Sequence, residues 1–231
     1  VRMFRTTEYQ RAGYNRQLIG GFEHALANNE LLFYLQPQVE VASGAIVGCE
    51  ALARWRRTDG TFVSPAEFVP ALEETGLISM LDKLIWDQVL ARLGERLVAG
   101  KRCVPVSVNV SRVDVLSFDV ADCLTELLEK YGVPAECIRV EITESSCTGG
   151  SSAVSKLTAR LHELGIHVHM DDFGTGHSSL GMLGSIDIDA LKLDREFVKD
   201  DFENDARRVK VVRSILAMAK ALDVPVVVEG A

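Results

Sequence analysis

The chain has 231 residues, of which 47% are hydrophobic, and its formal net charge is −8. This length suits one large α/β domain or two small ones, and the acidic balance argues against binding to a DNA or RNA polymer, which requires a basic surface. The five cysteines form no CxxC pair, no apolar run reaches the roughly 20 residues of a membrane span, and no signal peptide is visible, so we expect free thiols in the cytoplasm and any membrane anchor of a parent protein outside this chain.

The first half of the chain contains a predicted hairpin followed by a helix and a strand. Residues 11–29 are charged and compatible with a helix, so we expect a leading helix or linker there. Two apolar runs, 31–41 and 45–55, lie on either side of a short turn, and this spacing predicts a hairpin of two strands. Apolar residues recur at helical spacing over 81–97, and the β-branched run 103–110 predicts the next strand.

The second half of the chain alternates helices and strands. The apolar pattern predicts helices over 120–131, 154–164 and 209–222, and strands over 137–143, 167–173, 190–194 and 225–230. This order implies a parallel sheet with right-handed crossovers. Counted from Leu31, seven strands are predicted, one fewer than a (β/α)8 TIM barrel contains. The predicted fold class is therefore α/β.

Charged and amide side chains lie on or near the ends of the predicted strands. They are Glu50, Asn109, Glu141, Asp171, Asp172, Lys192 and Glu229. The C-terminal ends of the strands in a parallel barrel open onto one face, where active sites are built. Oxygen ligands of this kind suit Mg²⁺ or Mn²⁺ and not zinc. Any single carboxylate could instead cap a helix or face solvent, but the whole set buried together without a metal would repel itself strongly.

Two of these carboxylates are adjacent in the sequence. Asp171 and Asp172 follow one another on a predicted strand, so their side chains diverge. One of them could bridge two metals while the other binds only one. Two metals roughly 3.5–4 Å apart are a common device for phosphodiester hydrolysis.

A series of motifs surrounds these residues. They are Tyr34-Leu35-Gln36-Pro37, Gly48-Cys49-Glu50-Ala51-Leu52-Ala53-Arg54-Trp55, Ser64-Pro65-Ala66-Glu67-Phe68-Val69-Pro70, Glu73-Glu74-Thr75-Gly76, Ser107-Val108-Asn109-Val110-Ser111, Glu141-Ile142-Thr143-Glu144-Ser145, Asp171-Asp172-Phe173-Gly174-Thr175-Gly176, Leu191-Lys192-Leu193-Asp194 and Val228-Glu229-Gly230. On these motifs the chain resembles the EAL family of cyclic di-GMP phosphodiesterases over about residues 20–231.

The resemblance implies a TIM-like (β/α)8 barrel with an antiparallel first strand. It also implies hydrolysis of cyclic di-GMP to linear pGpG by water that two metals activate. The first metal would be held by Glu50, Asn109, Glu141 and Asp171. The second would be shared through Asp171 and held by Asp172 and Glu229. The cofactors would be Mg²⁺ or Mn²⁺, and Ca²⁺ should inhibit because it forms longer bonds with looser geometry.

The remaining roles also follow from the resemblance. Besides the ligands Glu50 and Glu229, the catalytic set would include Lys192, which would orient or polarise the attacking water. The dinucleotide would contact Gln36, Leu52 and Arg54, and Arg54 suits a phosphate oxygen. Glu144 would anchor the loop that runs from 172 to 180.

The resemblance also bears on domains and partners. Residues 1–19 resemble the connector that follows a GGDEF domain, and residues 20–231 would form the EAL domain. The last strand–helix unit and a substrate-side glutamine of the family are absent, so we expect the native protein to continue beyond Ala231. The implied partners are cyclic di-GMP, a second copy in a homodimer, and an upstream GGDEF or sensor domain in the same polypeptide.

Several alternatives remain open. The chain could be a non-catalytic cyclic di-GMP receptor, or another divalent-metal barrel enzyme such as a lyase with a lysine base. His169 could form a metal-binding pair with His167, or lie in the barrel interior and hydrogen-bond beneath Asp171. His177 is expected to face solvent. Cys49 and Cys147 are expected to be structural thiols.

Overall fold

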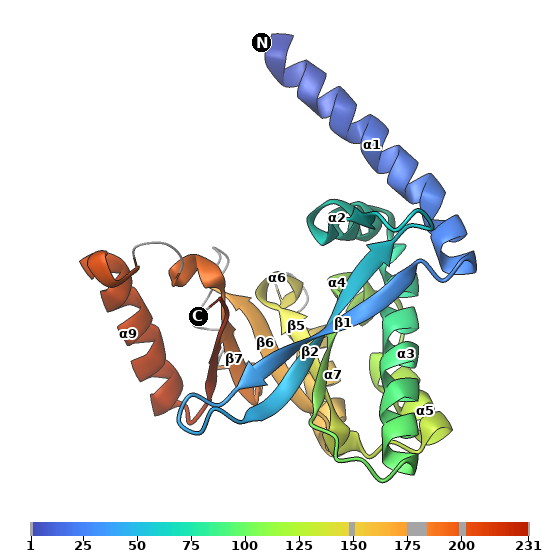
Figure 1. Ribbon diagram of the computed structural model, residues 1–231. Helices are drawn as coiled ribbons and strands as arrows, with labels where there is room; N and C mark the ends of the chain where they lie inside the picture. The colour runs from blue at the N-terminus through green and yellow to red at the C-terminus, as the bar shows by residue number, and fades with distance from the viewer. Residues whose placement is uncertain (1, 148–150, 175–183, 199–201, 231) are drawn as a thin grey trace.

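The computed structural model describes residues 2–147, 151–174, 184–198 and 202–230. Within these residues, eight strands form one sheet in the order β1-β2-β4-β5-β6-β7-β8, and the short β3 pairs with β2 alone. The sheet curls into part of a barrel (Figure 1). The strands are β1 (Leu31–Val39), β2 (Ile46–Arg56), β3 (Phe62–Val63), β4 (Val106–Val110), β5 (Ile138–Thr143), β6 (His167–Phe173), β7 (Ala190–Leu193) and β8 (Val226–Val228).

The first two strands form the predicted hairpin. β1 and β2 pair antiparallel, with Gln36 opposite Glu50 and Tyr34 opposite Leu52. From β2 onward, each neighbouring pair along the main order of the sheet is parallel. The α/β class and the antiparallel first strand are therefore confirmed. Parallel pairing brings the C-terminal ends of the strands to one rim.

Helices such as α3, α5 and α9 flank the curled sheet, while α1 projects away from it (Figure 1). The described helices are α1 (Arg2–Ala27), α2 (Pro65–Thr75), α3 (Ile78–Val98), α4 (Arg112–Ser117), α5 (Val120–Tyr131), α6 (Glu144–Cys147), α7 (Ser151–Glu163) and α9 (Ala206–Ala221), with 3-10 turns η1 (Ala135–Cys137), η2 (Arg195–Phe197) and η3 (Phe202–Asn204). Among the described residues, none of these helices combines the length and apolar character that a membrane span requires.

Short elements are what the sequence pattern missed. Periodicity predicted seven strands, but β3 adds an eighth, and α2, α4 and α6 were not predicted. Local hydrogen bonds account for α4, because Ser111 and Asp114 form a capping box with Asp114 N bonded to Ser111 Oγ at 3.1 Å. The last strand is shorter than the predicted 225–230, and α1 starts well before the predicted residue 11.

The end of α1 is fixed to the sheet through an aromatic cluster. Trp55 of β2 lies edge-on to Phe22 at 6.3 Å and to Phe68 at 5.8 Å between ring centroids. Its indole Nε1 donates to the buried carboxylate of Glu30 at 3.0 Å, which satisfies both polar groups. Burial of each of these rings stabilises the fold by about 1.5–3 kcal/mol. Earlier residues of α1 extend away from the body (Figure 1).

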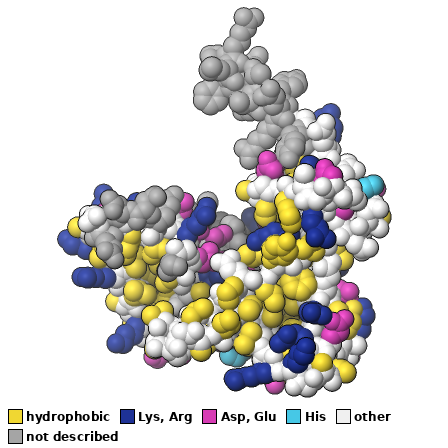
Figure 2. Space-filling view, in the orientation of Figure 1, with side chains coloured by type: hydrophobic (Ala, Val, Ile, Leu, Met, Phe, Trp, Pro, Cys, Tyr) yellow, Lys and Arg dark blue, Asp and Glu magenta, His cyan; other side chains and the backbone are white. Residues whose placement is uncertain are grey.

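The two outer strands of the sheet have one partner each on the main path. In the described part of the chain, β1 pairs only with β2, and β8 pairs only with β7. Exposed hydrophobic side chains on β1 and β2 include Tyr34, Leu35, Val39 and Ile46. Figure 2 shows hydrophobic side chains gathered over this side of the molecule.

Candidate metal and substrate site

Five strands deliver charged side chains to one point on the rim. Glu50 comes from β2, Glu141 from β5, Asp171 from β6 and Lys192 from β7. Glu229 follows β8, and its backbone N–H continues the pairing by donating to Leu193 O at 3.1 Å. The first and the last of them, Glu50 and Glu229, are more than 170 positions apart in the sequence. The parallel sheet is therefore what brings them together.

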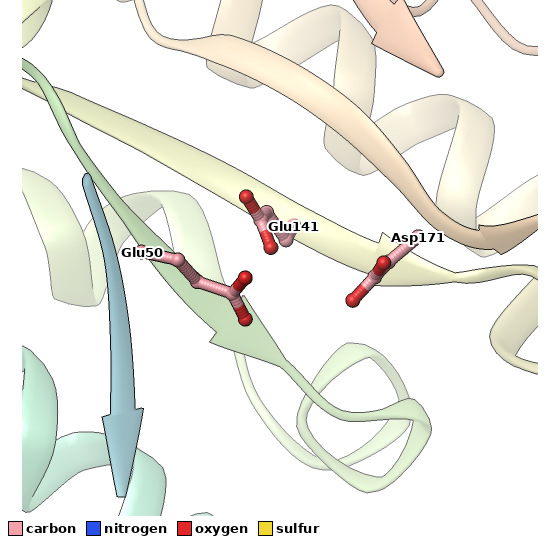
Figure 3. A group of neighbouring side chains, drawn as sticks. All are labelled: Glu50, Glu141 and Asp171. Atoms are coloured by element: carbon pink, nitrogen blue, oxygen red, sulfur yellow. The ribbon is translucent and has the colours of Figure 1, made fainter. Parts of the chain in front are cut away.

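Lys192 lies at the centre of this cluster. Its Nζ is 2.8 Å from Glu50 Oε2, 2.5 Å from Glu141 Oε2, 3.2 Å from Asp171 Oδ1 and 2.9 Å from Glu229 Oε1. Figure 3 shows the carboxylates of Glu50, Glu141 and Asp171 converging from separate strands. One ammonium thus pairs with four carboxylates, so the cluster has an excess of negative charge.

Burial shifts the pKa values of this cluster. It raises the pKa of Glu141 to about 7, with Lys192 opposing the shift and Glu50 adding to it. The pKa values of Asp171 and Glu229 are also raised, chiefly by burial. Burial disfavours the charge on Lys192, but Glu141, Asp171 and Glu50 outweigh it and raise the pKa of the ammonium. Lys192 therefore stays charged, but its single positive charge does not neutralise the surrounding carboxylates.

The remaining predicted ligands lie at the edge of the same cluster. Asn109 Nδ2 donates to Glu50 Oε1 at 3.2 Å, and its backbone carbonyl accepts from Trp86 Nε1 at 3.0 Å. Asp172 is half-buried, and burial together with Asp171 and Asp194 raises its pKa to about 6. Its backbone has a positive φ of 56°, which is rare outside glycine.

The chemistry of the donor atoms fits divalent cations. One oxygen from each of Glu50, Glu141 and Asp171 lies within 4.8 Å of the other two. Glu141 Oε1 is buried and has no hydrogen-bond partner in the described part of the chain. A buried carboxylate oxygen without a partner is costly, and a hard cation would relieve that cost. Mg²⁺ and Mn²⁺ prefer such ligands.

A cavity of about 360 Å³ opens beside the carboxylates. It is lined by Glu50, Asn109, Asp171, Asp172 and Glu229, and also by the three residues expected to contact substrate, Gln36, Leu52 and Arg54. Those three come from the β1–β2 hairpin, where Gln36 pairs with Glu50. The Arg54 guanidinium stacks over the Tyr34 ring with 5.5 Å from Cζ to the ring centroid, which orients its charge.

Glu144, expected to anchor the loop after β6, contacts the start of that loop. Its carboxylate is buried and its Oε2 accepts from the backbone N–H of Gly174 at 3.0 Å. Residues 175–183, which include His177, lie outside the described residues, so the expectation for His177 stays a prediction.

His169 is an interior residue, as one of the two alternatives held. It is buried, and its Nδ1 has no hydrogen-bond partner among the described residues, lying 3.9 Å from Glu141 Oε1. Burial, with Arg139 nearby, lowers its pKa to about 4. His167 is exposed and lies 3.6 Å from Asp189 instead, and the group of metal-ligand side chains found among the described residues, Glu50, Glu141 and Asp171, contains neither histidine. Cys49 is a free thiol whose pKa burial raises, in line with the structural role expected for it.

Sequence reasoning missed four acidic or hydroxyl residues that line the cavity: Glu73, Asp82, Ser111 and Thr143. Glu73, Ser111 and Thr143 belong to motifs of the resemblance and could have been considered. Asp82 gave no signal, because it lies within the apolar pattern of α3. It is buried, and burial together with Asp114 raises its pKa well above the ordinary value.

Comparison with known proteins gives a consistent family assignment. The family model described as EAL domain matches residues 21–231. The chain is 35% identical over 209 residues to the probable cyclic di-GMP phosphodiesterase PdeB of Escherichia coli, a match that covers 90% of this chain and 39% of PdeB. It is 32% identical over 220 residues to the cyclic di-GMP phosphodiesterase NbdA of Pseudomonas aeruginosa, covering 95% of this chain and 28% of NbdA. The chain thus spans well under half of these relatives.

A solved structure has the same fold. The PaMucR phosphodiesterase in its c-di-GMP complex superposes with a TM-score of 0.86 at 28% identity. The match covers 93% of this chain and 87% of that one.

Proposed function

The chain belongs to the EAL domain family, and from this premise we propose that it is a metal-dependent phosphodiesterase that hydrolyses cyclic di-GMP. The observation that carries the proposal is the cluster around Lys192. All the predicted ligands are present, and four carboxylates surround one ammonium beside a cavity that Gln36, Leu52 and Arg54 also line. Burying charges in this way is costly, which favours a catalytic role for the cluster over a receptor that only binds its ligand.

The proposed ligand sets follow the positions of the side chains. Glu50, Asn109, Glu141 and Asp171 would hold a first Mg²⁺ or Mn²⁺. Asp171, Asp172 and Glu229 would hold a second. When bound, two such ions supply activation of a water molecule and stabilisation of charge on the departing oxygen of the phosphodiester.

The residues of the chain itself would bind and orient the dinucleotide. Arg54 would pair with a phosphate oxygen, since its guanidinium is already oriented by the Tyr34 ring. Gln36 and Leu52 would hold the neighbouring part of the ligand on the hairpin. Lys192 would position the attacking water by its charge, and the buried carboxylates of Glu50 and Glu141 fix the Lys192 side chain for that role.

The larger relatives support a proposal about the rest of the protein. We propose that α1 connects this domain to an upstream GGDEF or sensor domain, since the relatives extend well beyond the matched region. We also propose that the functional unit is a homodimer in the cytoplasm. Crosslinking or light scattering of the purified chain would test the dimer.

The test of the activity is direct. Incubation of the purified chain with cyclic di-GMP and Mn²⁺ should yield linear pGpG, separable by chromatography. Tight binding of intact cyclic di-GMP without any pGpG, at saturating Mn²⁺, would instead identify a receptor. If the chain neither binds nor hydrolyses cyclic di-GMP, the proposal as a whole is refuted.

A further inference from the structure

The turn η2, Arg195–Phe197, directly follows β7 and lies between the ends of its two neighbouring strands. Leu193, the last residue of β7, pairs with Phe173 on one side and with Val228 on the other. Both partners are next to a ligand of the proposed second metal. Phe173 lies between Asp172 and Gly174, and Val228 directly precedes Glu229. The turn is therefore adjacent to both flanks of the proposed second metal site.

On the β6 side, Phe197 fills the space next to Gly174. A Cβ added at Gly174 would lie 2.7 Å from Phe197 Cε2 and still closer to Cζ, so the ring packs where a side chain would otherwise stand. The Gly174 φ of 95° is also one that side chains rarely adopt. Phe197 thus sets how far the backbone after Asp172 can move toward β7.

Glu144 holds the same backbone from another side. Its Oε2 accepts from the Gly174 N–H at 3.0 Å. Gly174 is therefore held between a hydrogen bond and an aromatic ring. Asp172, two residues earlier, has the unusual positive φ of 56°, a conformation that persists only when neighbouring contacts impose it.

On the β8 side, Arg195 has the same relation to Gly230, the residue after Glu229. A Cβ at Gly230 would lie 3.0 Å from Arg195 Cβ, and the Gly230 φ is 72°. The turn itself is tied down, because the Asp194 side chain accepts from Glu196 N at 2.6 Å and Phe197 N donates to Asp194 O at 3.1 Å. One hydrogen-bonded turn thus lies against both glycines.

From this arrangement we propose that η2, and Phe197 in particular, is a positioning element that sets the separation of Asp172 and Glu229 and so determines the affinity for the second metal. The inference rests on the proposed function, because it assumes the two-metal site. In this role Phe197 is not a ligand itself but acts through the backbone at Gly174. Of the first ligand set, only Asp171 lies at this end of β6, while Glu50, Asn109 and Glu141 come from β2, β4 and β5.

The test is a Mn²⁺ titration of the metal-free chain by calorimetry, with electron paramagnetic resonance to detect spin coupling between two neighbouring Mn²⁺ ions. Phe197→Ala should weaken the second binding event by about 10- to 100-fold, the usual effect of losing an outer-shell support. The first event should stay within about threefold on the same reasoning. Phe197→Leu, which retains most of the bulk, should recover much of the second event.

Phe33→Ala is the matched control, because Phe33 is also half-buried but lies in β1. It should lower thermal stability without changing the ratio of the two affinities. If Phe197→Ala weakens both events equally, or neither, the positioning role is refuted. If the wild-type chain binds a single Mn²⁺, the two-metal site of the proposed function fails first, and the inference falls with it.

A double-mutant cycle gives a second arm. Gly174→Ala should impair the second binding event severely in the wild-type background, where the new methyl group meets the Phe197 ring. In the Phe197→Ala background it should cost less, because only the strain of the left-handed backbone remains. Additive effects of the two substitutions would show that Gly174 and Phe197 do not act through each other, and would overturn the proposal.

Discussion

Replacing Lys192 by methionine removes the only ammonium found among the described carboxylates of the site while keeping an apolar stem of similar length. In the metal-free chain, Glu50, Glu141, Asp171 and Glu229 would then have lost a common partner that lies between 2.5 and 3.2 Å from each of them. The ammonium is almost fully buried, so water cannot replace it.

The structure gives the size of the effect. Removing one partner of a buried ion pair costs about 3–5 kcal/mol, because an uncompensated buried charge remains. A domain of this size loses about 2–4 °C in Tm per kcal/mol, so the metal-free variant should unfold roughly 6–20 °C below the wild type at pH 8. The loss should be smaller at pH 5.5, where Glu141, with a pKa raised to about 7, is protonated.

Divalent metal should reverse much of this loss, because a bound cation supplies the positive charge that the variant lacks. The assay is differential scanning calorimetry of both proteins in EDTA and in excess Mn²⁺. Turnover of cyclic di-GMP in Mn²⁺ should still fall by roughly 10²–10⁴, the scale of a lost electrostatic or acid–base contribution. Substrate affinity should change only a few fold.

Lys130→Met is the control. Lys130 pairs with Asp87 at 2.7 Å, about the same distance, but on the surface. Such a surface pair contributes little to stability, so the Tm should hardly move. If Lys192→Met and Lys130→Met lower the Tm equally, the buried cluster does not depend on its ammonium and the reasoning is wrong. A variant that loses affinity but keeps turnover would make Lys192 a binding residue.

Four further outcomes are expected. Glu50→Ala should reduce turnover to less than about a tenth at saturating metal, since the side chain is a proposed ligand. Circular dichroism should show an intact fold, because Lys192 keeps its contacts with Glu141, Asp171 and Glu229. Higher residual turnover would remove Glu50 from the ligand set. Mn²⁺ should bind at least about tenfold more weakly at pH 5.5 than at pH 8, because protons compete for Glu141 and Asp172, whose pKa values are raised to about 7 and about 6. The stability of the metal-free chain should depend on pH in the opposite direction. Because the pKa of Glu141 is raised, its ionisation lowers the free energy of unfolding progressively as the pH rises from 4.5 to about 7, which a series of melts in EDTA would detect. Ca²⁺ as the sole metal should not support hydrolysis, and full activity with Ca²⁺ would count against the two-metal site.

Local patterns in the sequence were sufficient for most of the sheet. The alternation of strands and helices, the hairpin and the parallel order follow from apolar periodicity, which depends only on neighbouring residues. Elements of a few residues were missed, because β3 and α4 are too short for a periodic pattern and arise from pairing with β2 and from the Ser111–Asp114 cap. The candidate ligands could be named because parallel strands present their C-terminal ends to one rim.

The sequence by itself determined which residues reach that rim, since strand order and the two-residue period of a strand fix the face on which each side chain lies. Only the tertiary structure decided how they meet. It put the Lys192 ammonium between four carboxylates and left Glu141 Oε1 without a hydrogen-bond partner among the described residues. It also brought Asp82 of α3 into the cavity wall and packed Phe197 against Gly174. These contacts join residues far apart in the chain, so their distances and pKa shifts depend on packing and burial, which no local pattern encodes.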